Sequence, residues 1–152
     1  PVRIICDSRL RTPVDSKIVR TAHNVRTIIA TAQTSGHERY TDCGCEIIHV
    51  PEKNGHIDLN ELMSKLGELK IDSIMLEGGG TLNWSALEAG IVNRVQCYIA
   101  PKIIGGNNAP SPIRGTGLNI MNDAVKLTAP DIIKLGDDYM IEGEIQHVYR
   151  NN

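Results

Sequence analysis

The sequence predicts an α/β protein: a mixed sheet with helices on both sides, ending in an antiparallel β-hairpin. Short β-rich runs alternate with helix-like segments over roughly the first two thirds of the chain. One run, residues 71–76, is almost wholly apolar, as is typical of a strand buried on both faces of a parallel sheet. The last third holds two strand-like runs joined by a Gly-Asp-Asp turn. With 152 residues and 41% hydrophobic residues, the chain is expected to form a single domain, 1–152, around one core.

Three strands are predicted in the N-terminal part, at residues 2–6, 25–31 and 46–50, because β-branched residues dominate each run. The first run ends at Asp-Ser-Arg, and a loop containing Pro13 follows to residue 16. Residues 35–44 are polar and predict a short helix followed by a turn. Pro51 ends the third strand.

The clearest predicted helix covers residues 58–69. Asp58 is a suitable N-cap, and Glu61 stands at the reciprocal position of a capping box. Apolar residues recur at helical spacing on one face and indicate core packing. They are Leu59, Leu62, Met63, Leu66 and Leu69.

The apolar run 71–76 is predicted as a fourth strand, followed by Glu77, three glycines and a helix at about residues 82–89. Gly90 is a suitable residue to end that helix. A fifth strand is predicted at residues 92–100, before Pro101.

The loop at residues 105–117 is rich in Gly, Pro and Asn. A loop of this length is typical of one that covers a site, and a plain surface crossover is the alternative. Residues 125–135 and 139–149 predict the two strands of the hairpin. Alternation places one set of side chains on one face and Glu142, Glu144 and Gln146 on the other. The first set is Tyr139, Ile141, Gly143, Ile145, His147 and Tyr149.

Composition excludes several classes of protein. The 16 basic and 18 acidic residues leave no basic excess for a nucleic-acid partner. With one Trp, four Tyr and no Phe, the chain offers few rings on which bases could stack. No apolar run approaches the roughly 20 residues of a membrane-spanning helix, so no membrane partner is expected.

No metal site is expected either. Only Cys43 and Cys45 are close in sequence, and neither they nor the five histidines form a zinc pattern. The four cysteines are expected to be reduced thiols of a cytoplasmic protein.

The segment from Glu77 to Gly90 carries the strongest chemical signal. Three successive glycines let a ligand approach the backbone closely, and the following helix start offers unpaired amides with partial positive charge. This arrangement suits a phosphate. However, Asn83 stands where the dinucleotide fingerprint G-x-G-x-x-G requires its third glycine, and no Walker lysine is present. A tight packing turn therefore remains the alternative.

Four segments, in this order, resemble one known family. They are the strand with Asp-Ser-Arg at residues 3–13, Gly-His-Ile-Asp-Leu at 55–59, Glu-Gly-Gly-Gly-Thr-Leu at 77–82, and Tyr-Ile-Ala-Pro-Lys-Ile-Ile-Gly-Gly at 98–106. Together they resemble the reductase domain of the bifunctional riboflavin-biosynthesis deaminase-reductase. The resemblance covers nearly the whole chain.

The resemblance implies a dihydrofolate-reductase-like fold: three layers, α/β/α, with a mixed, mostly parallel sheet and the C-terminal antiparallel hairpin. It implies NADPH-dependent reduction of 5-amino-6-(5-phosphoribosylamino)uracil to 5-amino-6-(5-phosphoribitylamino)uracil, with hydride delivered to the anomeric carbon. It further implies a homodimer, fused in the family to a zinc deaminase domain.

The resemblance also assigns roles to particular residues. Glu77 matches a substrate-contacting carboxylate, and the sequence does not show a catalytic proton donor. Arg9 and Arg11 are open to two interpretations, contacts to the cofactor 2′-phosphate or solvated charges. The cofactor-binding residues that it implies are Ser8, Gly79, Gly80, Thr81, Leu82, Asn83, Trp84 and Ser85.

The sequence departs from the family pattern in two ways. The deaminase zinc signature, H-x-E with P-C-x-x-C, does not occur, so no deamination is expected of these residues. The family's reductase domain also starts upstream of the Asp-Ser-Arg strand with further ligand contacts. We therefore expect this chain to be the C-terminal portion of a larger enzyme and to be weakly active or inactive alone. A non-catalytic nucleotide-binding module and a related reductase of a pterin-like substrate are the alternatives.

Overall fold

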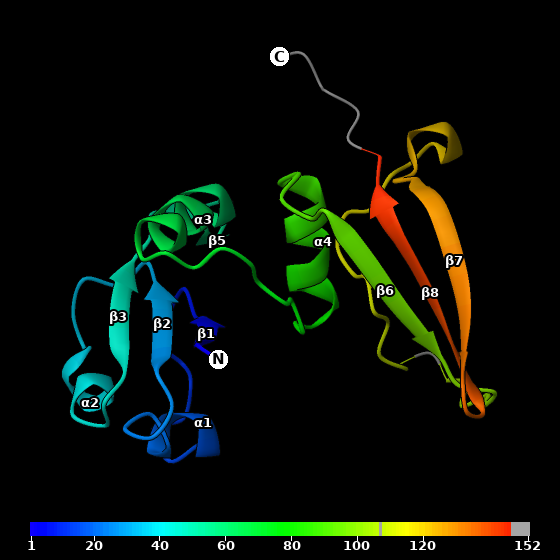
Figure 1. Cartoon of the computed structure of the whole chain (residues 1–152). Helices are drawn as coiled ribbons and strands as arrows, with labels where there is room; N and C mark the ends of the chain where they lie inside the picture. Colours follow the sequence, from blue (N-terminus) through cyan, green and yellow to red (C-terminus); the bar gives the residue numbers. More distant parts are fainter. Residues whose placement is uncertain (107, 147–152) are drawn as a thin grey trace. The chain divides into compact units, whose positions relative to one another are not determined.

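The computed structural model describes residues 1–106 and 108–146, and it divides into two compact units, Pro1–Ile74 and Met75–Asn152. Figure 1 shows the elements of each unit. Each sheet among the described residues lies within one unit.

The first unit is built on a parallel sheet of three strands, in the order β1-β2-β3. They are β1 (Arg3–Cys6), β2 (Thr27–Thr31) and β3 (Glu46–His49). In this sheet Ile5, Ile29 and Ile47 lie side by side in register. All five residues of β2 are buried, which agrees with its position between two neighbours. The three strands predicted from β-branched runs are thus confirmed.

Short elements connect these strands, and the longest helix of the unit follows them. Helix α1 (Lys17–Arg20) lies between β1 and β2, and α2 (Glu38–Thr41) lies between β2 and β3. A two-stranded ribbon of β4 (Glu52–Lys53) and β5 (His56–Ile57) follows β3. Helix α3 (Leu59–Glu68) begins where predicted, because the Asp58 carboxylate accepts hydrogen bonds from the amides of Asn60 (2.9 Å) and Glu61 (3.5 Å). Its apolar face is buried through Leu59, Leu62 and Leu66.

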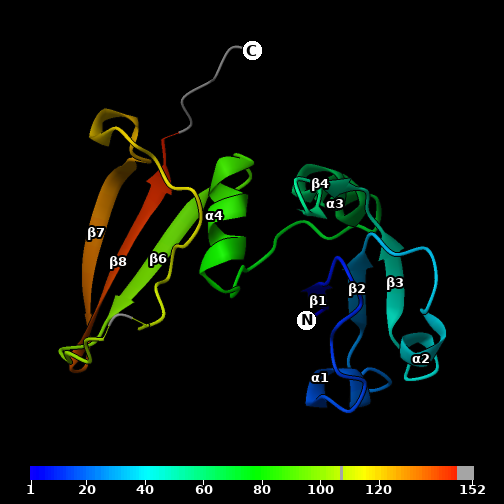
Figure 2. The same ribbon diagram turned by 180° about the vertical axis from the view of Figure 1, so that it is seen from behind.

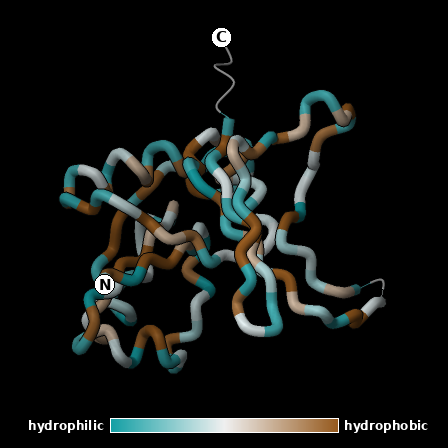
Figure 3. The backbone as a smooth tube through the Cα atoms, turned by 45° about the vertical axis from the view of Figure 1, so that its right-hand side comes forward, coloured by the Kyte–Doolittle hydropathy of each residue, from teal (hydrophilic) through white to brown (hydrophobic). Residues whose placement is uncertain are grey.

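One buried cluster of the first unit lies on the face of the sheet that carries Ile29. Buried side chains from the segment after β1 and from α2 gather there with Ile29. These are Leu10, Val19, Ala22, Tyr40 and Cys45. In the hydropathy colouring of Figure 3, hydrophobic segments recur along the tube between hydrophilic ones, as strands and amphipathic helices require.

The second unit consists of one helix and an antiparallel sheet in the order β6-β8-β7. Its elements are α4 (Gly80–Glu88), β6 (Arg94–Ile99), the 3₁₀ turn η1 (Met121–Asp123), β7 (Leu127–Leu135) and β8 (Asp138–Ile145). Helix α4 starts two residues before its predicted start and ends before Gly90, whose φ is +70°. Figures 1 and 2 show α4 beside the β6 edge of this sheet.

The hairpin of β7 and β8 confirms the predicted alternation within the described residues. Glu142 and Glu144 share one face and pair with Arg94 of β6, at 3.3 Å and 3.4 Å. Ile141 lies on the opposite face, in register with Cys97. The ladder of β7 is interrupted between Thr128 and Asp131, where proline at position 130 has no amide hydrogen to donate. His147 and Tyr149, predicted on the face of Ile141, lie outside the described residues.

One sequence prediction is wrong in this structure. Residues 71–76 form no strand; they are the chain at the boundary of the two units. Ile74, Met75 and Leu76 are exposed by 41%, 77% and 41%. An apolar run becomes a strand only beside a neighbouring backbone, and none of the described sheets pairs with this run. Among the described residues, the parallel and antiparallel strands therefore form separate sheets rather than the one mixed sheet predicted.

Candidate functional site

The glycine turn leads directly into the first turn of α4. Gly79 is the N-cap, with φ −74° and ψ 167°, and the Asn83 amide donates to its carbonyl at 3.0 Å. Within the described part of the chain, the amides of Gly80, Thr81 and Leu82 have no acceptor. Free amides at a helix start, with the helix dipole behind them, favour a negatively charged ligand.

Gly80 is the residue of the turn where a side chain is excluded. A Cβ on Gly80 would lie 2.6 Å from the Ser111 carbonyl oxygen and 2.9 Å from the Arg114 amide nitrogen. The Arg114 amide also donates to the Gly80 carbonyl at 2.9 Å. The backbone of the loop after β6 is thus in direct contact with the backbone of the glycine turn.

A hollow of about 860 Å³ opens beside the turn, inside the second unit. Gly78, Gly79, Gly80 and Thr81 line one part of it, and the loop after β6 lines another. The other lining residues are Leu82, Tyr98, Pro110, Ser111, Pro112 and Arg114. The turn therefore faces a space in which a phosphate ester can be held.

Three predicted cofactor residues are already engaged within the unit. The Asn83 side-chain amide donates to the Pro112 carbonyl (2.9 Å), and the Trp84 indole N–H donates to the Thr116 hydroxyl (3.1 Å). The Ser85 hydroxyl donates to the Thr81 carbonyl one turn back, at 3.0 Å. These donors hold the loop and the helix, whereas the Thr81 hydroxyl has no hydrogen-bond partner among the described residues. Leu82 packs over Gly78, so it offers a ligand its backbone.

Glu77, the predicted substrate carboxylate, lies just before the turn and is exposed. A glutamate at the end of a buried strand would need a partner for its charge. In the structure that strand is not formed, so Glu77 carries no burial cost and remains open to solvent.

Ser8 belongs to the first unit and follows β1. Its hydroxyl oxygen accepts a hydrogen bond from the Ile57 amide at 3.1 Å. The hydroxyl proton is therefore left for another acceptor, such as a ribose or phosphate oxygen. Ser8 stands at the carboxyl end of a parallel strand, where ligands bind in open α/β sheets.

A buried carboxylate shapes the turn that carries Ser8. Asp7 accepts hydrogen bonds from the Arg9 amide (3.3 Å), the Thr12 amide (2.7 Å) and the Thr12 hydroxyl (2.7 Å). Burial alone would raise the pKa of Asp7, but the bonds from the Thr12 side chain and from the backbone of Arg11, Thr12 and Arg9 hold that pKa below its ordinary value. Asp7 therefore remains a carboxylate at neutral pH and keeps the turn closed.

The second unit brings the glycine turn together with two residues that the sequence argument did not single out, Ser111 and Arg114. The available signal was the Gly- and Pro-rich loop, which was expected to cover a site. The length of this loop is typical of a loop that covers a site, but only the tertiary fold determines that it packs against Gly80.

Neither a metal cluster nor a membrane-spanning helix is found in the described ranges. No group of three or more His, Cys, Asp or Glu side chains there is placed to hold a metal ion. The helices described are all too short or too polar to cross a bilayer.

A parallel sheet followed by a glycine turn at a helix start defines an α/β protein suited to a phosphate-bearing ligand. The chain belongs to the family described as the RibD C-terminal domain, whose model matches residues 1–141. Among similar curated proteins, the riboflavin biosynthesis protein RibD of Actinobacillus pleuropneumoniae is 47% identical over 144 residues, which cover 93% of this chain and 38% of that protein.

Another relative is the 2,5-diamino-6-ribosylamino-4(3H)-pyrimidinone 5′-phosphate reductase of Methanothermobacter thermautotrophicus, 34% identical over 142 residues. This match covers 93% of the chain and 65% of the relative. The chain thus spans just under two thirds of that reductase and much less of the RibD relative.

Solved structures support the fold. Acinetobacter baumannii RibD matches with a TM-score of 0.77 at 21% identity, covering 96% of this chain and 38% of that one. The riboflavin biosynthesis reductase Rib7 of Saccharomyces cerevisiae matches with a TM-score of 0.73 at 19% identity, covering 97% and 70%. The α/β fold class predicted from the sequence is confirmed by these likenesses.

Proposed function

We propose that this chain functions as a reductase of riboflavin biosynthesis. The reaction proposed is NADPH-dependent reduction of 5-amino-6-(5-phosphoribosylamino)uracil to its ribitylamino counterpart. Membership of the RibD C-terminal domain family supports this, and so does the reductase activity named for the Methanothermobacter relative. That relative's name also makes the 2,5-diaminopyrimidinone phosphate a second candidate substrate.

The observation that carries the proposal is the turn at Gly79 and Gly80. Free amides of Gly80, Thr81 and Leu82 line a hollow of about 860 Å³, and no side chain on Gly80 fills the space. These groups fit a diphosphate, which accepts hydrogen bonds and carries negative charge. The cofactor, when bound, supplies hydride to the anomeric carbon of the ribose.

The residues of this chain bind and orient in this scheme. The amides after Gly79 and the Thr81 hydroxyl hold the diphosphate, while Asn83, Trp84 and Ser85 keep the helix start and its loop in place. In the first unit, Ser8 donates its remaining proton to the cofactor. Glu77 contacts the substrate hydroxyl or amino groups, consistent with its exposure.

We propose further that the complete reductase has the dihydrofolate-reductase-like arrangement of three layers and acts as a homodimer. The described residues hold a parallel sheet in the first unit and an antiparallel sheet in the second. The chain spans only 65% of the Methanothermobacter reductase, so we expect the remainder to supply further ligand contacts. A cytoplasmic location is proposed because all four cysteines are free thiols.

Fluorescence titration with NADPH tests the proposed cofactor site. Trp84, the only tryptophan, stands in the helix that starts at the glycine turn, so its emission reports on the site. Thr81→Val keeps the side-chain shape but removes the hydroxyl, and we expect roughly 3- to 10-fold weaker NADPH binding. Thr128→Val on β7 is the matched control, since it removes a hydroxyl bonded to the Glu144 carbonyl within the hairpin.

Activity distinguishes the enzyme from its alternatives. The chain is expected to bind NADPH with weak or no turnover of either pyrimidine phosphate. Efficient turnover by the 152-residue chain would show that it needs no further segment. Reduction of a pterin in preference to the pyrimidines would favour the related reductase, and absence of NADPH binding would contradict the cofactor site itself.

A further inference from the structure

Leu10 holds an uncommon backbone conformation in the turn that carries Ser8. Its φ is +52°, in the left-handed region that residues with a Cβ adopt rarely. Its side chain is only 4% exposed and belongs to the buried cluster of Ile29 and Val19. Such a conformation persists only where surrounding groups hold it.

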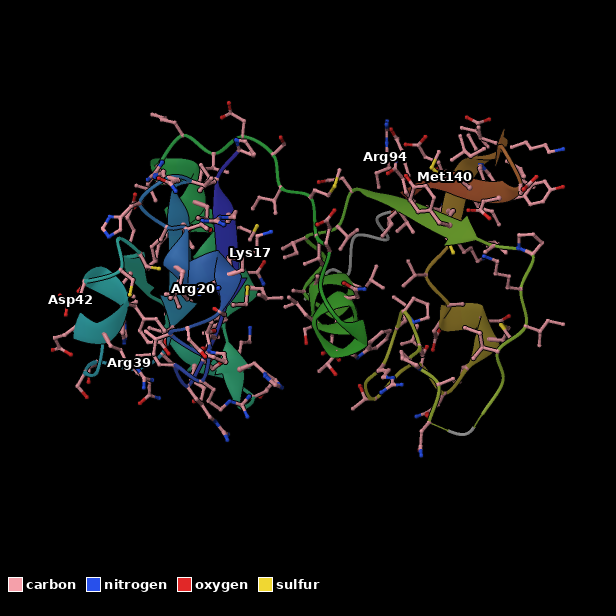
Figure 4. All side chains as sticks on the ribbon, turned by 90° about the horizontal axis from the view of Figure 1, so that it is seen from below. Lys17, Arg20, Arg39, Asp42, Arg94 and Met140 are labelled. Atoms are coloured by element: carbon pink, nitrogen blue, oxygen red, sulfur yellow. The ribbon has the colours of Figure 1, made fainter. Side chains whose placement is uncertain are left out.

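Two side chains of α2 hold Leu10 by its carbonyl. The Tyr40 hydroxyl lies 2.9 Å from the Leu10 carbonyl oxygen and 2.8 Å from that of Thr12, so its single proton serves one of them at a time. Arg39, labelled in Figure 4, donates to the Leu10 carbonyl at 2.5 Å and to the Tyr40 hydroxyl at 3.0 Å. The Arg39 guanidinium also lies 4.8 Å from the centre of the Tyr40 ring.

Tyr40 is completely buried, and its hydroxyl donates to the carbonyls of this turn. Its exposed fraction is 0%, and its ring packs in the same cluster as Leu10 and Ile29. A buried hydroxyl needs a hydrogen-bond partner, and the two carbonyls of the turn provide it. Tyr40 therefore joins α2 to the turn after β1, a connection across 30 residues of sequence.

The turn is held at two points. Asp7 closes it through the amides of Arg9 and Thr12, and Tyr40 holds the carbonyls of Leu10 and Thr12. Ser8 lies inside this segment, and the burial of Leu10 leaves its neighbours Arg9 and Arg11 exposed. The direction of the Ser8 hydroxyl thus depends on a conformation that α2 stabilises.

We propose that Tyr40 is a positioning residue for cofactor binding: its hydroxyl holds the strained turn that presents Ser8 at the carboxyl end of β1. The inference rests on the proposed role of Ser8 as a cofactor contact. Tyr40 itself does not touch the ligand. Loss of its hydroxyl leaves the ring in the core but removes a donor from Leu10 and Thr12, so the turn samples other conformations and Ser8 is presented less often.

The experiment measures NADPH binding and amide hydrogen exchange in the 152-residue chain. Tyr40→Phe is expected to weaken NADPH binding roughly 3- to 10-fold, the range that one neutral hydrogen bond is worth. It is also expected to speed exchange at the amides of Arg9, Thr12 and Ile57, which are bonded within or to the turn. Ile29→Val, which shortens a side chain of the same cluster and removes no bond to the turn, is the control for general loss of stability.

Ser8→Ala separates this proposal from the proposed function. If Ser8→Ala weakens NADPH binding and Tyr40→Phe does so while Ile29→Val does not, positioning by Tyr40 is supported. If Tyr40→Phe leaves both binding and exchange at the level of Ile29→Val, the positioning role is overturned, whatever Ser8→Ala does. If Ser8→Ala leaves binding unchanged, the assignment of Ser8 as a cofactor contact fails, and the proposal that Tyr40 positions Ser8 for the cofactor is overturned with it.

Discussion

Substitution of Gly80 by alanine tests whether the glycine turn is shaped by close approach of the neighbouring loop. Gly80 is the first residue of α4, and helix propensity favours alanine over glycine there by at most the value of about 1 kcal/mol that holds in a helix interior. Propensity alone therefore predicts that Gly80→Ala stabilises the helix. The tertiary structure predicts the opposite, because the new methyl group would lie 2.6 Å from the Ser111 carbonyl oxygen.

The steric effect outweighs the gain in helix propensity. Of the three atoms within 3 Å of the new methyl, the Arg114 Cγ belongs to a side chain, but the Ser111 oxygen and the Arg114 nitrogen are backbone atoms, so relief requires the loop to move. Overpacking of this kind costs about 1–3 kcal/mol. Movement of the loop also breaks the bond from the Arg114 amide to the Gly80 carbonyl, worth about 1 kcal/mol. We expect the free energy of unfolding of the second unit to fall by about 1–3 kcal/mol.

Thermal unfolding followed by Trp84 fluorescence measures this change, because Trp84 is the only tryptophan and belongs to the second unit. A loss of this size corresponds to a decrease in Tm of roughly 4–24 °C for a unit below 100 residues. Gly79→Ala is the matched control, because its φ is −74° and a Cβ there meets nothing within 4 Å. The N-cap preference for glycine over alanine and the lower entropy of the unfolded alanine chain oppose each other, so we expect a change within about 1 kcal/mol. Equal Tm values for the two variants, or a more stable Gly80→Ala, would refute the reasoning.

Three further outcomes are expected. Asp58→Ala removes the cap of α3 and should lower the free energy of unfolding by about 0.5–2 kcal/mol; an unchanged denaturant midpoint would contradict the cap. The pKa of Asp7 is lowered in the folded state, so its stabilisation is present above the unfolded pKa of about 4 and is lost as the pH falls through the folded value. Asp7→Asn should therefore be less stable at pH 7 by about 1–3 kcal/mol and should flatten acid denaturation below pH 4, which urea titrations across pH would detect. Burial raises the pKa of Cys6 to about 11 whereas Cys97 is exposed, so a thiol reagent at pH 8 should label Cys97 first, and faster labelling of Cys6 would contradict the burial.

Much of the local structure could be predicted from neighbouring residues. Asp58 caps α3 as the capping pattern indicates, and Gly90 follows α4 with the positive φ that its lack of a Cβ allows. The hairpin of β7 and β8 follows from alternation, which sets which side chains share a face. Each of these features depends on residues within a few positions of one another.

The structure of the apolar run 71–76 could not be predicted from its own residues. Its composition suits a buried strand, but a strand is completed by hydrogen bonds to another backbone, and none of the described sheets pairs with it. Hydrophobicity indicates that a segment favours burial; the presence of a neighbouring strand depends on the rest of the molecule.

In the candidate site, too, some features follow from neighbouring residues and others depend on distant ones. The sequence by itself determined that three glycines precede a helix, and therefore that free amides and an accessible backbone occur at Gly79 and Gly80. Only the tertiary structure decided how the nearby polar groups are used: Asn83 and Trp84 bond residues 29 and 32 positions away, and Tyr40 holds Leu10 across 30 positions. The physical reason is that caps and turns are stabilised by adjacent residues, whereas the availability of a donor for a ligand depends on which distant carbonyl the fold brings within hydrogen-bond distance.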